Sequence, residues 1–342
     1  MSDSKIRIAC VGAGYFAQYH IEAWTRVSNV ELVAICDIDT EKAQKLADKY
    51  QVPKVYKGIE TLLEDSVVDF IDIITPPSTH ADLINRISQK GIHIICQKPF
   101  TRSLAEARVM VKLAHARKVS LFIHENFRFQ PWYGKIKELK DQGILGGLHN
   151  VQLKLRTGDG WGDDAYLNRQ PYFRKMPRLF MYETGIHYID VFRYLHGEIV
   201  EVYAKLGTFN ANIKGEDHAL VVFTFTDGTT ALLDANRYNE SNTDDPRYTF
   251  GKITLEGRKG VIYLESDSSL FYKPLGEDPV NVDYVRSNVN FAGDCVYHAQ
   301  SAMMKSYREQ FDFETRAEVY LRNMVVLEAV YKSAATNQPV RV

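Results

Sequence analysis

Short apolar runs, separated by segments of helical pattern, fill the first third of the sequence. The runs are Ile6–Val11, Val30–Cys36, Val67–Ile74, His93–Cys96 and Ser120–Ile123. Runs this apolar are typical of parallel strands that are buried on both faces. Between them, helices are expected from the N-cap pair Asp39–Thr40, from about Thr79, and from Ser103, which forms a capping box with Glu106, to about Lys118. The alternation predicts a doubly wound α/β domain over residues 1–125.

The rhythm changes after about residue 126, where strand-like segments follow one another directly. Turn residues separate 219–226 from 229–234, and 252–256 from 261–265, as in antiparallel hairpins. We therefore expect residues 126–342 to form an α+β domain with a mostly antiparallel sheet. A helix over about 315–336 carries Tyr320, Met324, Leu327 and Tyr331 on one face, and it could pack back on the first domain.

Composition narrows the class of protein. A chain of 342 residues that is 45% apolar and 25% charged has room for two globular domains. Its net charge of -1 argues against nucleic acid or an anionic membrane as a partner. Because the first apolar run begins at Ile6 in MSDSKIRIACVGAG, we expect no signal peptide before the first strand. The four cysteines form no CxxC pair, so we expect reduced, buried thiols in a cytoplasmic protein and no metal site.

A glycine-rich turn directly after the first strand is the strongest local signal. It reads Gly12-Ala13-Gly14-Tyr15-Phe16-Ala17, and Asp37 follows Gly14 after 23 residues. Gly12 permits a tight turn, Gly14 lets a pyrophosphate approach the backbone, and a carboxylate at Asp37 can bind the ribose hydroxyls. The pattern predicts a Rossmann domain that binds NAD rather than NADP. The alternative is a tight turn without a nucleotide.

Two further strand ends carry candidate ligand-binding residues. Thr75, Pro76 and His80 follow one buried run, and Gln97 and Lys98 follow the next. Ligands of open α/β sheets bind at the carboxyl ends of the strands. The ammonium of Lys98 could bind sugar hydroxyls or stabilise a developing alkoxide. A well-made strand–helix turn and a solvated lysine are the alternatives.

Glu183, His187 and Asp190 share one face if their segment is helical. A histidine between two carboxylates can be tuned for proton transfer near neutral pH. The alternative is an exposed Glu–His pair on a surface helix.

Residues 156–178 fit neither a strand nor a helix pattern. The segment is rich in glycine, aromatic residues and arginine, and long loops without regular structure are usually functional or disordered. We interpret it either as a loop that closes over a ligand or as an arm between subunits. Trp161 and Arg169 are candidates near the nicotinamide half of the cofactor, and Tyr172 and Arg178 are candidates near the substrate.

Together these motifs resemble the glucose–fructose oxidoreductase / inositol dehydrogenase (Gfo/Idh/MocA) family over essentially the whole chain. The motifs are GAGYFAQYH, CDID, ITPPSTH, QKP and ETGIHYID. Gln97 stands where the family usually has glutamate, and Glu183 where many members have aspartate. Within the family, residues 176–198 are similar to the D-apiose dehydrogenases.

The resemblance implies an activity and a site. It implies catalysis by Lys98, His187 and Glu183, a cis peptide before Pro99, and a homo-oligomer (dimer or tetramer) formed through the open face of the second sheet. The implied reaction is oxidation of a sugar with NAD, favouring an aldose such as a D-apiose-like pentose, which would give a lactone. An inositol or polyol dehydrogenase that gives a ketone is the alternative, as is a non-catalytic NAD-bound regulator.

The expected site residues fall into two sets. The cofactor set comprises Gly12, Gly14, Tyr15, Phe16, Asp37, Thr75, Pro76, His80, Gln97, Lys98, Asn126, Trp161 and Arg169. The substrate set comprises Lys98, Arg128, Tyr172, Arg178, Glu183 and His187.

Overall fold

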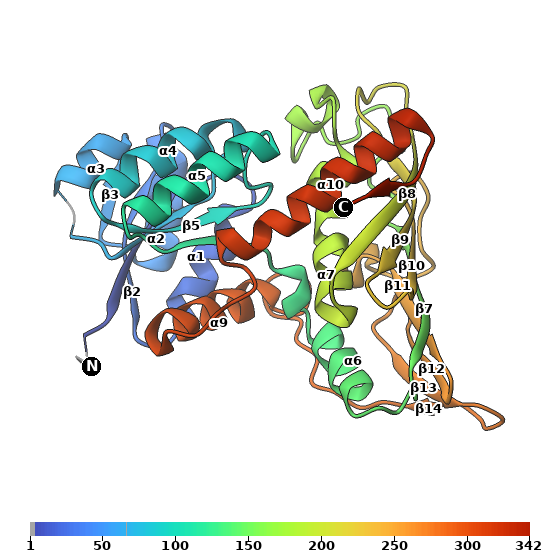
Figure 1. Cartoon of the computed structure of the whole chain (residues 1–342). Helices are drawn as coiled ribbons and strands as arrows, with labels where there is room; N and C mark the ends of the chain where they lie inside the picture. The colour runs from blue at the N-terminus through green and yellow to red at the C-terminus, as the bar shows by residue number, and fades with distance from the viewer. Residues whose placement is uncertain (1–3, 66) are drawn as a thin grey trace. The chain divides into compact units, whose positions relative to one another are not determined.

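The computed structural model describes residues 4–65 and 67–342, which divide into two compact units (Figure 1). The N-terminal unit runs to Asn126 and also includes Val296–Arg322. The C-terminal unit comprises Phe127–Cys295 and Asn323–Val342. The expected domain boundary lies next to this division, but residues 296–322, expected in the second domain, group with the first unit.

The N-terminal unit is built on a six-stranded parallel sheet in the order β3-β2-β1-β4-β5-β6. Its strands are β1 (Ile6–Val11), β2 (Val30–Cys36), β3 (Lys54–Tyr56), β4 (Phe70–Ile73), β5 (His93–Gln97) and β6 (Leu121–His124). The five apolar runs all lie in this sheet, and β4 is shorter than its run. This order, with two strands beyond β1 on one side and three on the other, is that of a doubly wound fold.

Helices connect these strands. They are α1 (Ala17–Arg26), α2 (Thr40–Tyr50), α3 (Ile59–Asp65), α4 (Pro77–Gln89) and α5 (Leu104–Ala116). Helix α9 (Cys295–Glu309) lies beside α1, since Gln300 donates to the carbonyl of His20 and Arg308 to that of Asn29. The expected caps at Asp39 and Ser103 are confirmed. Helix α4 begins two residues earlier than expected because Pro77 suits the first helical position.

The C-terminal unit contains a nine-stranded sheet in the order β14-β13-β12-β11-β7-β10-β9-β8-β15. Its strands are β7 (Leu148–Arg156), β8 (Ile199–Gly207), β9 (His218–Phe225), β10 (Thr230–Asn236), β11 (Lys252–Gly257), β12 (Gly260–Leu264), β13 (Leu270–Pro274), β14 (Val280–Asn281) and β15 (Val340–Arg341). Both expected hairpins, β9–β10 and β11–β12, are antiparallel. The central pair β7–β10 is parallel, so the sheet is mixed.

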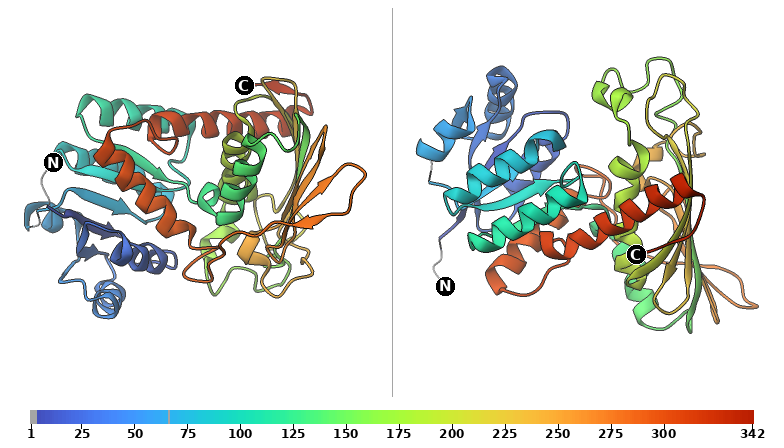
Figure 2. Two further views of the ribbon diagram at one scale, coloured as in Figure 1. Left: turned by 90° about the horizontal axis from the view of Figure 1, so that it is seen from below. Right: turned by 45° about the horizontal axis from the view of Figure 1, so that its top comes forward.

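The helices of this unit lie along one face of the sheet (Figure 2). They are α6 (Pro131–Asp141), α7 (Ile186–His196) and most of α10 (Ala317–Thr336), together with the short segments η1 (Phe127–Phe129), η2 (Pro171–Lys175), η3 (Met181–Gly185) and α8 (Pro246–Thr249). Buried and more exposed residues alternate along β9 and β10, so only one face of these strands is covered. The face expected for α10 is confirmed, because Tyr320, Met324 and Leu327 are buried and Tyr331 is partly buried.

Residues 156–178 are held in place by contacts within the segment and with neighbouring parts of the C-terminal unit. Tyr166 and Phe173 pack with Leu179 and Ile213 in a small buried cluster. Asp159 accepts hydrogen bonds from Arg237 and from Arg169, the latter at 2.7 Å. Burial alone raises the pKa of the Asp159 carboxyl, but the two guanidinium charges outweigh it and hold the pKa well below its usual range. The segment is therefore anchored to the end of β10 by a largely buried ion pair.

This ion pair predicts a specific loss of stability. Removing one partner of a buried pair costs about 3–5 kcal/mol, so Asp159→Asn should lower the free energy of unfolding in urea at pH 7 by roughly this amount. Because the folded-state pKa is depressed, the wild-type contribution is present above the ordinary carboxyl pKa of about 4 and is lost as pH falls below it. Asp159→Asn should therefore show a shallower loss of stability below about pH 4.

The exposed Asp163 of the same segment provides the matched control. Asp163→Asn should unfold within about 0.5 kcal/mol of wild type, as surface substitutions usually do. An Asp159→Asn protein that unfolds at the wild-type urea concentration would contradict the anchoring role.

Candidate functional site

The glycine turn joins the ends of three strands in the N-terminal unit. Gly12 has φ +113°, and a Cβ there would meet the carbonyl carbon and oxygen of Ile74 at 2.8 Å. Its N–H donates to the carbonyl of Cys36 at 2.8 Å. Both the positive φ and the close approach to the end of β4 exclude a side chain. The expected tight turn is confirmed, and the reason for glycine includes contact with the neighbouring strand.

Asp37 is held beside this turn. One carboxylate oxygen accepts the N–H of Ala13 at 2.6 Å, and the other accepts the N–H of Asp39 at 2.7 Å. The side chain remains partly exposed. The glycine turn and the end of β2, which are more than 20 residues apart in sequence, are thus joined by a direct hydrogen bond between Ala13 and Asp37.

The turn fits the phosphates of a dinucleotide. A Cβ on the exposed Gly14 would meet no atom within 4 Å, so the backbone is open to a ligand on that side. Tyr15 and Phe16 follow, with Phe16 at the N-cap of α1, where free N–H groups favour anions. Tyr15 pairs its hydroxyl with that of Tyr19, and Phe16 packs edge-on against His20. These residues and the Asp37 carboxylate match the parts that hold a pyrophosphate and a ribose.

Thr75, Pro76 and His80 form the turn after β4. The hydroxyl of Thr75 pairs with that of Thr79 at 2.7 Å, and Pro76 is the N-cap of α4. The buried His80 ring lies between the carbonyls of Thr75 and Phe100, at 2.8 and 2.9 Å. Burial lowers the pKa of His80. The His80 ring therefore connects this turn to the residues after β5. The contact of His80 with the cofactor that the sequence predicts stays a prediction.

Gln97 and Lys98 end β5, and the Lys98–Pro99 peptide is cis, as the resemblance implied. Gln97 is 8% exposed, and its side-chain oxygen accepts the N–H of Lys98 at 2.6 Å. Asn126, just beyond β6, is buried at the last position of this part of the unit. The expected cofactor residues of the N-terminal unit thus gather at the carboxyl ends of its parallel strands.

In the C-terminal unit, Glu183 and His187 lie on consecutive helical turns. Glu183 belongs to the π-helical turn η3, which runs directly into α7 with His187 in its first turn. Glu183 is 9% exposed and His187 4% exposed, so the alternative of an exposed surface pair is wrong. The imidazole of His187 stacks on Phe127, with ring centroids 3.8 Å apart and planes 4° apart. Single π turns inside helices occur frequently at functional sites.

The carboxylate of Glu216 fixes the start of this segment. It accepts the N–H groups of Leu179 and Met181, at 3.2 and 3.0 Å, and the hydroxyl of Tyr331 at 2.6 Å. The same hydroxyl accepts the N–H of Tyr182 at 3.1 Å. Glu216 therefore caps the helical turn that carries Glu183.

Asp190 is used differently from what its spacing suggests. Its buried carboxylate binds the guanidinium of Arg128 at 2.6 and 2.7 Å and the amide of Asn323 at 2.7 Å. Arg128 is itself 4% exposed. This ion pair fastens η1 to α7, so two guanidinium nitrogens of the expected substrate residue Arg128 face Asp190.

The four candidate ligand-binding residues of the segment 156–178 differ in exposure and in their partners. Trp161 is 57% exposed and donates to Glu240 at 3.3 Å, while Arg169 binds Asp159. Arg178 binds Glu328 at 2.7 Å and lies over the Tyr331 ring. Tyr172 is 43% exposed, and burial and then the charge of Glu183 raise its pKa.

Sequence reasoning missed Arg237, at the end of β10. Its guanidinium binds Asp159 and donates to the hydroxyl of Thr184 at 3.1 Å, next to Glu183. Burial lowers its pKa, but the charge of Asp159 outweighs burial and raises the pKa above its usual range. The only signal for Arg237 in the sequence is its position directly after a strand of alternating pattern. Its partners, Asp159 and Thr184, lie more than 50 residues away in sequence and could not be inferred.

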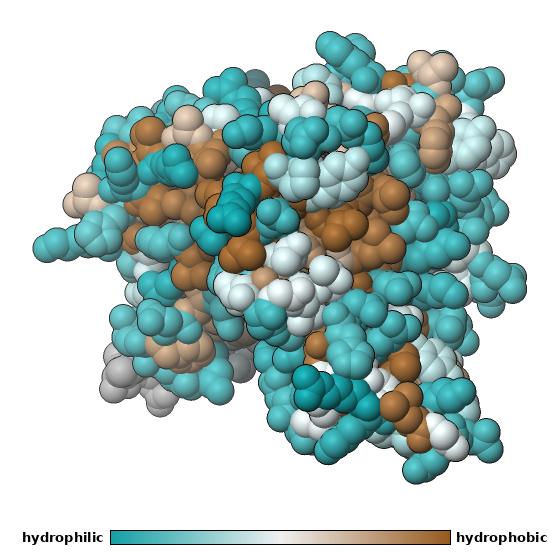
Figure 3. All heavy atoms as spheres, turned by 45° about the vertical axis from the view of Figure 1, so that its right-hand side comes forward, coloured by the Kyte–Doolittle hydropathy of each residue, from teal (hydrophilic) through white to brown (hydrophobic). Residues whose placement is uncertain are grey.

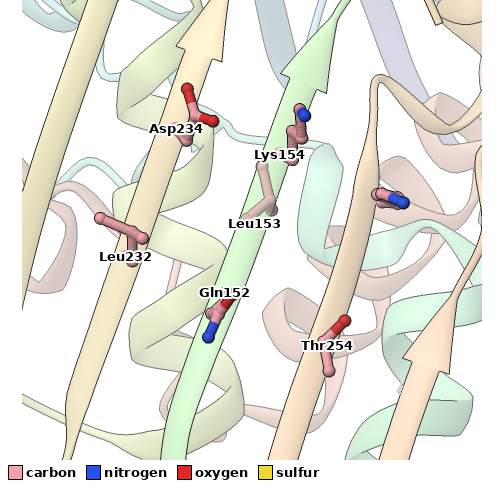
Figure 4. Close-up of a pocket in the computed structure, with 7 residues that line it drawn as sticks. Gln152, Leu153, Lys154, Leu232, Asp234 and Thr254 are labelled. Carbon is pink, nitrogen blue, oxygen red and sulfur yellow. The ribbon is translucent and has the colours of Figure 1, made fainter.

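A separate depression of about 140 Å³ lies on the uncovered face of the second sheet (Figure 4). Side chains of β7, β10 and β11 line it, among them Lys154, Asp234 and Thr254. It shares no residue with the expected site. Within residues 4–65 and 67–342, no group of three or more His, Cys, Asp or Glu side chains is arranged to hold a metal ion. Among the helices of the described chain, none is both long and apolar enough to cross a bilayer.

Curated proteins of known name resemble the chain over most of its length. It is 30% identical to the D-apiose dehydrogenase of Paraburkholderia graminis over 266 residues, which are 78% of this chain and 69% of that protein. It is 26% identical to the D-apiose dehydrogenase of Rhizobium rhizogenes over 99% of this chain and 98% of that protein.

A solved structure and two family models agree with these relatives. An oxidoreductase from Agrobacterium radiobacter, crystallised with NAD+, L-tartaric acid and magnesium, superposes with a TM-score of 0.89 at 25% identity, covering 99% of this chain and 98% of that one. Residues 6–125 match the model of the GFO_IDH_MocA oxidoreductase family with an NAD-binding Rossmann fold, and residues 133–263 match the GFO/IDH/MocA C-terminal domain. The chain therefore belongs to the GFO/IDH/MocA family and is an NAD-dependent oxidoreductase.

Proposed function

We propose that the protein oxidises an aldose sugar at its anomeric carbon to a lactone, with a D-apiose-like pentose as the favoured substrate. The observation that carries the proposal is the placement of Glu183 and His187 on consecutive turns, both buried, with Phe127 stacked on His187 and with Glu216 and Arg237 bonded to the neighbouring Met181 and Thr184. The naming of two relatives as D-apiose dehydrogenases favours the pentose.

Each proposed group has a chemical role. NAD, when bound, supplies the two-electron acceptor. Gly12, Gly14 and Asp37 hold its phosphates and ribose. His187 takes the proton of the hydroxyl at the carbon being oxidised, and the flat stack on Phe127 fixes the plane of its ring. Lys98 donates to the same oxygen and stabilises its developing negative charge. Glu183 accepts a second hydroxyl and so orients the sugar.

An inositol or polyol dehydrogenase is the second candidate function, because proteins similar to the chain include inositol 2-dehydrogenases. An inositol or polyol substrate would use the same three residues and give a ketone. A non-catalytic NAD-bound regulator would have no need to keep Lys98, Glu183 and His187 together.

The activity is tested by NADH formation with a panel of aldoses, inositols and linear polyols. We expect the highest kcat/KM with D-apiose and a lactone as the first product. His187→Ala should lower kcat roughly 10²–10⁴-fold, the usual share of a positioned acid–base group. Lys98→Met should also lower kcat severely, while Glu183→Ala should act more on KM, because its role is to bind a hydroxyl.

His196→Ala is the matched control, since His196 ends the same helix and pairs with Asp227. It should leave kcat unchanged. A ketone product would favour the polyol alternative, and NAD binding without turnover on any member of the panel would favour the regulator. Wild-type kcat in His187→Ala would remove His187 from the mechanism.

We propose a preference for NAD over NADP, supported by the Asp37 carboxylate beside the glycine turn. A 2′-phosphate there would meet a like charge, which costs several kcal/mol in a poorly hydrated site. The ratio of kcat/KM for NAD to that for NADP should therefore exceed about 100 and should fall at least 10-fold in Asp37→Ala. Equal kcat/KM values for both cofactors in wild type would contradict the assignment.

We also propose a cytoplasmic homo-oligomer. The four cysteines are free and buried, which supports a reducing compartment. The uncovered sheet face exposes Leu220 (41%) and partly exposes Val222 and Leu232. Hydrophobic side chains reach the surface in brown between teal hydrophilic ones in Figure 3. Such apolar surface suits a second copy of the chain.

The oligomer is checked by light scattering. The wild-type mass should be a dimer or tetramer, and Leu220→Glu/Leu232→Glu should reduce it to the monomer, because it places charges on the paired faces. Lys112→Glu, on an exposed position of α5, is the control and should leave the mass unchanged. A monomeric wild-type protein would exclude the proposal.

A further inference from the structure

A fully buried carboxylate lies in the N-terminal unit, where an apolar residue would be expected. Asp72 stands in the middle of β4 at 0% exposure. Its Oδ2 lies 2.7 Å from His20 Nδ1 and 2.7 Å from Trp24 Nε1, both on α1. A buried carboxylate requires such donors, so Asp72 fixes the His20 ring in one orientation.

The opposite edge of that ring meets Gln97. His20 Nε2 lies 3.1 Å from Gln97 Nε2, and Gln97 Oε1 accepts the N–H of Lys98 at 2.6 Å. A backbone N–H can only donate, so the amide oxygen must face Lys98 and the amide nitrogen must face His20. His20 Nε2 therefore accepts, and the imidazole proton resides on Nδ1 and is donated to Asp72.

The chain of donors and acceptors is thus continuous from Asp72 through His20 and Gln97 to the main chain of Lys98. Its three side chains are 0%, 0% and 8% exposed. The ring of His124 packs on His20 with centroids 3.9 Å apart, which further restricts the imidazole. The hydrogen bond to Asp72 and the stack on His124 together restrict the orientation of the His20 ring.

We propose that His20 and Gln97 are positioning residues that fix the main chain of Lys98 and thereby aim its ammonium, while Asp72 holds the imidazole proton of His20 on Nδ1. The inference rests on the proposed role of Lys98 in stabilising charge on the substrate oxygen. The amide at position 97 fills both roles in this path, because its nitrogen donates to His20 Nε2 and its oxygen accepts the N–H of Lys98.

Two substitutions of His20 distinguish its hydrogen bond to Asp72 from its hydrogen bond with Gln97. The amide nitrogen of asparagine can replace Nδ1 and keep the hydrogen bond to Asp72, but it does not reach Gln97. The longer glutamine side chain can replace the Nε2 acceptor and keep the hydrogen bond from Gln97. His20→Asn should lower kcat about 10- to 100-fold, as small misplacements of a reacting group do, whereas His20→Gln should stay within about 3-fold of wild type. The Kd for NAD should change less than about 2-fold in both.

Trp24→Phe is the structural control. It removes the other donor to Asp72 Oδ2 and leaves the path from His20 to Lys98 intact. Its melting temperature should fall, but its kcat should remain at the wild-type value. An equal fall of kcat in His20→Asn, His20→Gln and Trp24→Phe would show that the cluster only packs the core, and would overturn the proposal.

Combining His20→Asn with Lys98→Met tests whether His20 acts through Lys98. If His20 acts through Lys98, then His20→Asn should lower kcat no further once Lys98 is replaced. Full additivity of the two substitutions would overturn the positioning role while leaving the proposed function in place. Wild-type kcat in Lys98→Met alone would instead overturn the proposed role of Lys98, and the positioning role with it.

Discussion

Buried carboxylates must be met by donors, and this constraint places the polar side chains of both units. Asp72 and Asp190 are fully buried, and Glu216 is nearly so. Asp72 binds two side chains of α1, whereas Asp190 binds groups of η1 and α10, and Glu216 binds groups of η3 and α10. An unpaired buried charge is far more costly than any of these contacts is favourable. The carboxylates therefore determine which helices must dock and in which register.

The same constraint explains why the candidate site is held so firmly in the C-terminal unit. Arg237 is nearly buried, and it can remain charged there because Asp159 compensates it. Having been fixed by that pair, its guanidinium reaches the hydroxyl of Thr184. Arg237 therefore has two roles: it stabilises the fold through its ion pair with Asp159, and it fixes Thr184, the residue next to Glu183. Preorganised polar groups of this kind favour charge development without reorganisation.

The parts predicted correctly from sequence are those with local causes. The turn at Gly12 and the caps at Asp39 and Ser103 depend on residues within a few positions. The parallel pairing of β7 with β10 could not be predicted, because its strands lie about 80 residues apart and alternation does not reveal a partner. Asp72 did carry a signal, since a carboxylate inside the apolar run VVDFIDII demands a buried donor, but the donor's identity required the structure.

Residues 296–322 group with the N-terminal unit although the whole second sheet, apart from β15, precedes them in the chain. Gln300 and Arg308 bind main-chain carbonyls of His20 and Asn29, and Tyr320 binds Glu125. During synthesis the ribosome releases the N-terminal strands first, but these contacts form only after at least 300 residues have been made. The N-terminal unit therefore begins before the second sheet is made and is completed only after all of that sheet except β15 has followed. Its maturation waits for translation to residue 322, and a chain that stops before residue 295 leaves α1 without its neighbour α9.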